Sequence, residues 1–385
     1  MSSPPAVTTL ADAVRASHDR YLAELERLVN IDCGSYTREG VNRVADFCAD
    51  AFAALGASVE RVEHERLGDL VIGRLEGDGP RLLLIGHMDT VFEAGTVAER
   101  PFRVEGDRAF GPGVTDMKAG LLAGFHAIRA LQSAGARPSV TYVCNPDEEI
   151  GSPFSSPHIR ALVPQHDAAF VLECARANGD IVSARKGVAD VHISIGGRAA
   201  HAGVEPQKGR SAILEAAHKV LALHALNGRW PSVTVNAGVI EGGTRPNVVA
   251  ERCLVKVDVR GATAAEFEAA GEALREIAAS ATVAGTTAEV RRVSGHAPME
   301  KSEATARLVS LAQAVAAALG FALGDAATGG ASDANTTSGM GLPTLDGLGP
   351  IGGDDHSVDE WLELSSVVPR VTLLAALMAR ADEAL

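Results

Sequence analysis

Side chains that can bind metal ions or transfer protons stand shortly after three apolar segments of this sequence. They are His87 and Asp89 after residues 82–85, Glu148 and Glu149 after 141–144, and Glu173 after 168–172. A continuous apolar run of this kind is typical of a buried strand. Charged groups at the end of a buried strand lose hydration, and a bound cation commonly offsets that loss. The pattern therefore predicts a polar site at the carboxyl edge of an α/β sheet.

The same residue types suit a pair of divalent metal ions. Two metals held close together polarise a carbonyl and generate hydroxide between them, which suits hydrolysis of a stable amide at neutral pH. Such a site needs neutral imidazoles and carboxylates, one of which bridges the metals. The chain offers five such residues: His87, Asp116, Glu149, Glu173 and His356.

Three acidic residues have distinct expected roles around these ligands. Asp116 is the candidate for the bridging carboxylate. Glu148 stands next to a ligand and is placed to act as general base on the metal-bound water. Asp89, two residues from His87, is placed to orient that imidazole.

Each segment taken alone has a plainer interpretation. A His-x-Asp after a strand is often structural, and an acidic run such as 147–149 is often a solvated loop or an anionic helix start. His356, in a glycine-rich loop, carries no information by itself. Only the joint occurrence of these segments in one chain favours a metal site.

The elements that must position these residues alternate between strand and helix through Glu173. Apolar periodicity predicts helices over 11–29, 41–55 and 116–133, and strands over 58–63, 70–75 and 81–85. Such alternation predicts an α/β domain with a mixed, mostly parallel sheet flanked by helices. Further helices are expected at 302–318 and 367–381, after the chain has returned to this domain.

The pattern changes after about residue 180. It predicts strands at 189–195, 233–241, 253–259 and 288–293, with helices at 211–226 and 264–281. This β-α-β-β-α-β order is that of the ferredoxin-like motif. We therefore expect two domains: a discontinuous catalytic domain, residues 1–182 and 294–385, and an inserted α+β domain, residues 183–293.

Composition excludes several classes of function. The chain has 385 residues, 46% hydrophobic and 22% charged, and a net charge of −14, which argues against a nucleic-acid partner. Its apolar stretches predict no membrane span. The five scattered cysteines predict reduced thiols, and the first residues show no signal-peptide pattern, so a cytoplasmic protein is expected.

Four segments that carry these residues, in order along the chain, resemble one family. Residues 86–91, 111–120, 147–152 and 349–356 are similar to the zinc peptidases that include glutamate carboxypeptidase, acetylornithine deacetylase, succinyl-diaminopimelate desuccinylase and aminoacylase. The resemblance implies two Zn²⁺ ions per subunit, with Co²⁺ or Mn²⁺ as possible substitutes. It also implies that the inserted domain is a lid and dimerisation domain.

The resemblance assigns each residue a role. Asp116 bridges the two zinc ions, with His87 and Glu173 completing one site and Glu149 and His356 completing the other. Glu148 is implied to be the base, and Asp89 to support His87.

Within that family the chain is most similar to the glutamate carboxypeptidase (carboxypeptidase G) branch, through residues 184–187, 197–203, 242–249 and 329–333. The branch implies that His201 of one subunit reaches the partner's active site and stabilises the oxyanion. It implies that Asn247 and Arg260 hold the substrate carboxylate, with Lys208 a weaker candidate; a planar guanidinium suits such a contact.

Plainer interpretations remain open for two of these residues, and one position departs from the branch. His201 stands in a Gly/Ala-rich turn and can simply bond the backbone, and Arg260 can pair with an acidic neighbour. Cys174 follows Glu173 where the branch commonly has proline, which leaves the pocket shape open.

The expected activity is hydrolysis of an amide next to a free C-terminal carboxylate, in a small-molecule or peptide substrate. We expect release of glutamate or a similar amino acid by a homodimer. Two alternatives are an N-acyl amino acid deacylase of the same family and a metal-binding homologue without turnover.

Overall fold

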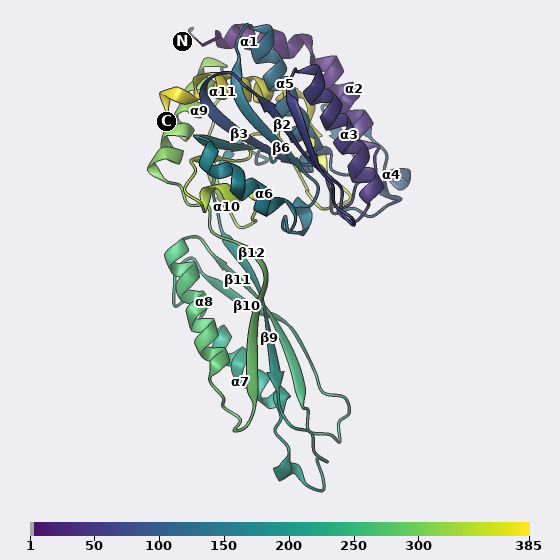
Figure 1. Ribbon diagram of the computed structural model, residues 1–385, viewed down its shortest axis with the longest axis vertical. Coiled ribbons are helices and arrows are strands. Elements are labelled where there is room, and N and C mark those ends of the chain that lie inside the picture. The colour runs from purple at the N-terminus through teal and green to yellow at the C-terminus, as the bar shows by residue number, and fades with distance from the viewer. Residues whose placement is uncertain (1–3) are drawn as a thin grey trace. The chain divides into compact units, whose positions relative to one another are not determined.

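The structure, a computed structural model, describes residues 4–385. Met1–Ser3 lie outside the described residues. They are part of the N-terminal segment in which the sequence shows no signal-peptide pattern. The chain forms two compact units (Figure 1). The first unit comprises Met1–Ser183, Lys301–Ala327 and Ser332–Leu385, and the second comprises Ala184–Glu300 and Thr328–Ala331.

The first unit is built on a six-stranded sheet of order β1-β2-β6-β3-β7-β14. The strands are β1 (Ser58–Val62), β2 (Leu70–Leu75), β3 (Asp78–His87), β6 (Pro138–Asn145), β7 (Ala168–Val171) and β14 (Thr344–Leu345). Strands β6, β3, β7 and β14 run parallel, whereas β1 and β2 pair antiparallel. The predicted α/β fold with a mixed, mostly parallel sheet is therefore confirmed.

Helices and strands of the first unit share one hydrophobic core. The helices are α1 (Val7–Ala16), α2 (His18–Val29), α3 (Arg38–Ala54), α4 (Thr96–Glu99), α5 (Ala119–Ser133), α6 (Ser155–Leu162), α9 (Glu303–Ala318), α10 (Asp333–Ser338) and α11 (Val367–Arg380). The segment Leu364–Glu383, which contains α11, is long and apolar enough to cross a membrane by length and composition alone, but 67% of its apolar window is buried in the structure. We interpret it as a core helix, because α11 packs against α5, α1 and α9.

Two smaller sheets include strands of the first unit. One has the order β15-β16-β5-β4 and contains β15 (Gly352–Gly353), β16 (Trp361–Glu363), β5 (Arg108–Phe110) and β4 (Arg103–Glu105). In the other, β13 (Asp325–Thr328) pairs with β8 (Ile181–Arg185). The first of these sheets matters for the site, because it joins the segment before Asp116 to the segment that follows His356.

Two helix predictions need correction. The helix expected over 11–29 is two helices, broken at Ser17, whose hydroxyl donates to the Val14 carbonyl and lies 3.1 Å from Nδ1 of His126. The helix expected from Asp116 begins at Ala119 instead, because Asp116 has a non-helical backbone and donates its N–H to another side chain. Both breaks depend on contacts between segments far apart in sequence.

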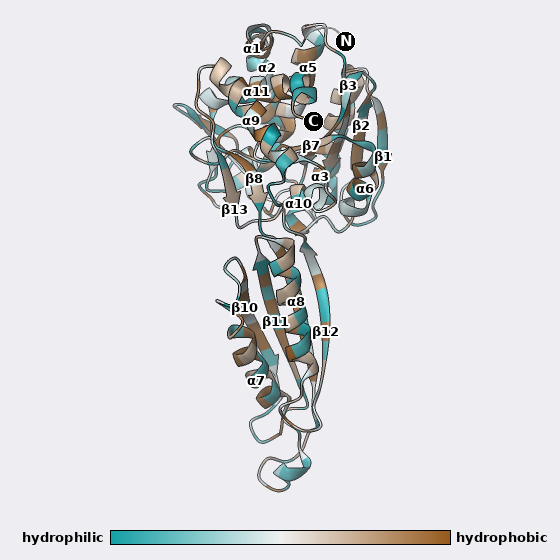
Figure 2. Ribbon diagram, turned by 90° about the vertical axis from the view of Figure 1, so that its left-hand side faces the viewer, coloured by the Kyte–Doolittle hydropathy of each residue, from teal (hydrophilic) through white to brown (hydrophobic). Residues whose placement is uncertain are grey.

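The second unit is an antiparallel sheet of order β10-β11-β9-β12 with two helices on one face (Figure 1). Its elements are β9 (Gly187–Gly196), α7 (Ala212–His224), β10 (Thr234–Gly242), β11 (Arg252–Gly261), α8 (Ala264–Ala279) and β12 (Thr287–His296). The order along the chain and across the sheet is that of the expected ferredoxin-like motif. Val191, Ile193 and Ile195 of β9 are buried in the core of this unit, and edge strand β12 is mostly exposed and hydrophilic (Figure 2).

Candidate metal centre

Three neighbouring parallel strands end at one edge of the first unit's sheet. His87 is the last residue of β3 and pairs with Asn145, the last residue of β6. On the other side of β3, strand β7 ends at Val171, two residues before Glu173. Because parallel strands point the same way, their terminal polar groups meet there. The structure thus brings together the three segments from which the sequence predicts a site.

Asp116 lies between two imidazoles. Its Oδ1 is 3.1 Å from Nε2 of His87, and its Oδ2 is 3.1 Å from Nε2 of His356. Glu149 and Glu173 flank this arrangement: Oε2 of Glu149 is 3.2 Å from Nε2 of His356, and Oε1 of Glu173 is 3.8 Å from Nε2 of His87. The five predicted ligands therefore form two groups that share one carboxylate.

This set of groups fits divalent cations. Ligand atoms of His87, Asp116 and Glu149 lie within 4.8 Å of one another, as do those of His87, Glu148 and Glu173. Oε1 of Glu149 is buried and has no hydrogen-bond partner within residues 4–385. A buried carboxylate oxygen without a donor is costly unless a cation satisfies it. Imidazole and carboxylate ligands are those that Zn²⁺ binds in hydrolases.

The carboxylates of this site outnumber its imidazoles, and they raise the pKa of both histidines. Hydrogen bonds with Asp116 and Glu149 raise the pKa of His356 to about 11. Burial lowers the pKa of His87, but hydrogen bonds with Asp116 and Asp89 outweigh it and leave the pKa well above its ordinary value. Burial raises the pKa of Glu149 as well. The site therefore retains protons in the absence of another cation, and a bound metal ion displaces such protons from its ligands.

Glu148 lies among these groups but makes different contacts. Burial, and then the negative charge of Glu173, raise the pKa of its carboxyl group well above the ordinary value. The backbone N–H groups of Glu148 and Glu149 donate to Oδ1 and Oδ2 of Asp89, at 3.1 and 3.2 Å. A carboxyl group with a raised pKa beside ligands is suited to accept and return a proton.

Asp89 is a fully buried anchor of the site. Besides its bonds to the backbone of 148–149, its Oδ2 accepts the hydroxyl hydrogen bond of Ser35 at 2.7 Å. Its backbone carbonyl is 3.0 Å from Nδ1 of His87. Asp89 thus connects the end of β3 with the loop after β6, and it orients the His87 ring so that Nε2 faces Asp116.

A residue that the sequence analysis missed holds Asp116 in place. The carboxylate of buried Glu360 accepts the backbone N–H groups of Gly113, Thr115 and Asp116, at 2.9, 2.9 and 3.0 Å. Burial raises its pKa to about 7 in spite of these bonds. These contacts keep Asp116 out of helix α5. The available signal was an acidic residue directly before the apolar pair 361–362, four residues after His356.

A second buried network fixes the loop that carries Glu148 and Glu149. Asp333 accepts hydrogen bonds from Asn145 and from the hydroxyl of Ser152, the latter at 2.6 Å. Burial raises the pKa of Asp333 to about 6. Asp147 accepts the N–H of Phe154 at 2.6 Å. The loop therefore has anchors on both sides of the two glutamates.

The His356 loop is strained and more open than the rest of the site. Asp354 and His356 have φ angles of 58° and 62°, a left-handed conformation that is uncommon for residues other than glycine. The His356 side chain is 55% exposed. Cys174 is buried beside this loop, with Sγ 3.6 Å from a carboxylate oxygen of Asp355, and burial raises the pKa of its thiol. All five cysteines are free and buried, as expected.

The other predicted site residues belong to the second unit. Nδ1 of His201 accepts the N–H of Gly203 at 3.1 Å, so the neutral ring carries its proton on Nε2. The backbone carbonyl of Asn247 accepts the N–H of Ala202, and the exposed Lys208 pairs with Glu205. His201, Asn247 and Lys208 therefore lie near one another.

Arg260 lies at the opposite end of the second unit's sheet. It pairs with Val188, at the start of β9, whereas His201 follows the end of that strand. Strand β9 has ten residues and spans roughly 30 Å at about 3.3 Å per residue. Arg260 also bonds Asp258 at 3.0 Å and the Gly329 carbonyl at 2.9 Å. Within one chain, the structure does not bring Arg260 together with Asn247 and His201.

Two imidazoles around a shared carboxylate at a sheet edge are suited to the divalent metal ions of a hydrolase. The profile of peptidase family M20/M25/M40 matches residues 83–380, and the chain belongs to this family, as its motifs predicted. It is 32% identical to carboxypeptidase G2 of Pseudomonas sp. (strain RS-16), over 92% of this chain and 87% of that protein. It is 28% identical to acetylornithine deacetylase of Myxococcus xanthus, over 62% of this chain and 66% of that protein.

The fold agrees with the solved structures of peptidases. A tripeptidase from Staphylococcus aureus superposes with a TM-score of 0.80 at 22% identity, covering 95% of this chain and 99% of that one. The predicted enzyme class, a hydrolase of the metallopeptidase type, is therefore confirmed. The family relationship and the ligand groups together support divalent metal binding.

Proposed function

We propose that this protein is a di-zinc hydrolase that cleaves an amide next to a free C-terminal carboxylate, releasing glutamate or a similar amino acid. The observation that carries the proposal is the shared carboxylate: each oxygen of Asp116 faces a different imidazole at 3.1 Å. His87 and Glu173 complete one metal site, and Glu149 and His356 complete the other. Bound metal ions supply polarisation of the substrate carbonyl and a water of lowered pKa.

The side chains around the metals perform the proton transfers. Glu148 takes a proton from the attacking water and later delivers it to the nitrogen of the leaving amine. Its raised pKa, caused by burial and by Glu173, suits a group that must both accept and release a proton. Asp89 holds the backbone of Glu148 and thereby positions the base.

The choice of substrate rests on the relatives. Carboxypeptidase G2 is similar over most of both chains, which favours a carboxypeptidase. The similarity to an acetylornithine deacetylase supports the alternative, an N-acyl amino acid deacylase. A panel of N-acyl amino acids that varies acyl group and amino acid separately distinguishes the two. Rates that depend on the released amino acid support the carboxypeptidase; rates that follow the acyl group alone support the deacylase.

A metal-binding protein without turnover is the remaining alternative. The presence of Glu148 next to the ligands counts against it, because metal binding alone does not need a proton acceptor there. Metal uptake with no hydrolysis of any member of the panel would favour this alternative.

We further propose a homodimer formed through the second unit, with that unit serving also as a lid. Strand β10 lies at a free edge of its sheet, and its Ile240 is 53% exposed. Neighbouring helix α7 exposes Ile213, Leu214 and Leu221, the last at 70%. A free strand edge next to exposed apolar side chains suits pairing with a second copy of the same surface. The separation of His201 from Arg260 supports this proposal, because two chains can supply residues that one chain keeps apart.

His201 is expected to act in the active site of the partner subunit. Its Nε2–H is available as a donor to the oxygen on which negative charge develops. Dimers that mix a His201→Ala chain with a Glu148→Ala chain then contain one site with both residues intact. Refolded from an equal mixture, these inactive variants should recover about a quarter of wild-type activity, since half of randomly paired dimers are mixed and each has one intact site.

Activity should appear only when the His201→Ala and Glu148→Ala chains are mixed before they are refolded. Each variant refolded alone is the control, and both should remain inactive while retaining wild-type mass in sedimentation analysis. If the mixture stays as inactive as its components although mixed dimers form, His201 acts within its own chain or has no catalytic role.

A further inference from the structure

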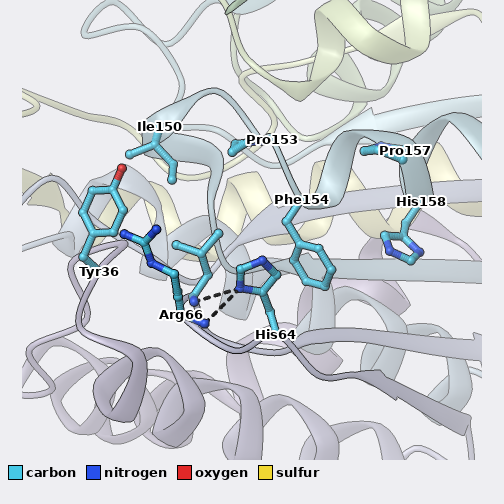
Figure 3. A pocket seen from close by; sticks show the side chains of 9 residues that line it. Tyr36, His64, Arg66, Ile150, Pro153, Phe154, Pro157 and His158 are labelled. Carbon is cyan, nitrogen blue, oxygen red and sulfur yellow. Dashed lines mark hydrogen bonds between the residues drawn. The ribbon is translucent and has the colours of Figure 1, made fainter.

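The segments around the metal centre differ in what lies next to them. The loop that carries Glu149 borders an open cavity of about 530 Å³, with the next residue, Ile150, in its lining (Figure 3). The segments that carry Glu173 and lead to His356 lie instead against Arg370 of α11, whose side chain is buried and only 2% exposed. This buried arginine has no role in the mechanism above.

The Arg370 guanidinium donates hydrogen bonds to three backbone carbonyls. Nε donates to Gly349 at 3.0 Å, Nη1 to Gly179 at 3.0 Å and Nη2 to Gly347 at 2.5 Å. Among residues 4–385, no carboxylate forms a salt bridge with this group. Burial lowers the pKa of Arg370 to about 10, so the group is still charged at neutral pH. A buried charge is costly unless it is hydrogen-bonded, so the three carbonyls are held firmly at the guanidinium.

Two of these carbonyls belong to the segment that lies beside Glu173. The N–H of Gly349 donates to the Glu173 carbonyl at 2.8 Å, and the N–H of Ala175 donates to the Pro350 carbonyl at 3.1 Å. A parallel bridge between Ala175 and Ile351 continues this pairing. The contact is close, since a Cβ atom added to Gly349 would lie 2.8 Å from the Glu173 carbonyl oxygen. The position of Gly349 therefore determines where the backbone of Glu173 lies.

The third carbonyl, that of Gly179, lies in a turn shortly after Glu173. Arg370 thus joins that turn to the segment 347–351, from which the chain continues to His356 five residues later. Glu173 and His356 are ligands of the two different proposed metal sites. One buried side chain therefore supports one ligand in each of them.

We propose that Arg370 is a positioning residue for the metal centre. It holds the backbone of Glu173 and of the segment leading to His356, and so sets the spacing between these two ligands. This role rests on the proposed di-zinc site and belongs to a residue outside the five proposed ligands. Supporting groups of this kind commonly contribute about ten- to a hundredfold to metal affinity. Within the described chain, the guanidinium does not hydrogen-bond the other three ligands, so its loss should weaken metal binding without abolishing it.

The zinc affinity of the metal-free protein, measured by competition with a chelating dye, tests this role. Arg370→Lys keeps the charge but replaces the planar fork of donors with a single ammonium group. Arg370→Gln removes the buried charge and keeps an amide donor. In each variant the dissociation constant for zinc should rise about tenfold or more.

The matched control is Arg307→Lys. Arg307 lies on α9 and donates its Nε to the Ala384 carbonyl at 2.8 Å, so the substitution removes the same kind of hydrogen bond away from the site. This variant should bind zinc with the affinity of the wild-type protein.

The unfolding temperature of the same metal-free samples separates positioning from stability. Loss of buried hydrogen bonds can lower this temperature in either case, so zinc affinity is compared where the proteins are folded; if one Arg370 variant does not fold, the other decides. Folded variants with wild-type zinc affinity would show that Arg370 only stabilises the fold, and would overturn the proposal while leaving the hydrolase intact. Weakened zinc binding, in a protein whose wild-type form cleaves no substrate, would support the role of Arg370 and contradict the proposed reaction.

Discussion

Glu148→Gln is expected to lower kcat by about a thousandfold, the scale typical of losing a general base. Glutamine has the size of glutamate but accepts no proton at neutral pH, so the attacking water keeps its proton and the leaving amine receives none. Because Glu148 is not one of the five proposed ligands, the zinc content of the variant should match that of the wild-type protein. The measurement is steady-state hydrolysis of N-benzoyl-glutamate, with zinc determined by atomic absorption on the same samples.

The control for this variant is Glu105→Gln, on exposed strand β4. It makes the same chemical change away from the site and should retain wild-type rates. A Glu148→Gln protein with more than a tenth of the wild-type kcat would contradict the assignment of Glu148 as the base. A large loss of zinc in that variant would instead identify Glu148 as a ligand, which its proximity to His87 and Glu173 permits.

Asp116→Asn is expected to remove metal from both sites at once. One carboxylate faces His87 with Oδ1 and His356 with Oδ2, so neither proposed site keeps its full set of ligands when the charge is lost. We expect zinc content to fall from two ions per chain to one or fewer, and kcat/KM to fall by at least about a hundredfold, the upper end of the losses seen when only a supporting residue is changed.

Asp12→Asn in α1 provides the matched control, since its side chain is 77% exposed and pairs with Arg15 on the same helix. Zinc bound per chain should be measured after dialysis against metal-free buffer, together with the unfolding temperature. Two retained zinc ions in folded Asp116→Asn protein would show that Asp116 does not bridge.

The sequence predicts which candidate ligands lie together because strand ends carry most of them. His87 and Glu173 stand at the ends of apolar runs, and parallel strands necessarily bring such ends to one edge. His356 is different: its loop lacks a local pattern, and only the resemblance to a family places it with Asp116. The structure puts their side chains 3.1 Å apart.

Residues that support the centre were harder to predict. Glu360 acts on the backbone of residues 113–116, far away in sequence, and no spacing rule connects an acceptor with backbone donors that distant. For the same reason the apolar periodicity predicts the start of α5 three residues too early. A helix boundary set by a tertiary hydrogen bond leaves no mark in the apolar periodicity.

The apolar periodicity also does not predict that Arg260 and Asn247 lie far apart. Both lie next to strands that the sequence predicts, but which end of the sheet each occupies depends on the antiparallel pairing of β11 with β9. That pairing places Arg260 opposite Val188 and leaves Asn247 beside the segment after Gly196. The two residues can serve one substrate only if they come from different chains.

Release of glutamate from N-benzoyl-glutamate, before and after removal of metal, tests the central proposal most directly. The zinc-loaded protein should liberate free glutamate, chelation should abolish this activity, and two equivalents of Zn²⁺ per chain should restore it. Hydrolysis that continues unchanged in the fully chelated protein would contradict a metal centre built on Asp116. Failure of the zinc-loaded protein to release any amino acid from benzoyl, acetyl or dipeptide substrates would contradict the proposed reaction itself.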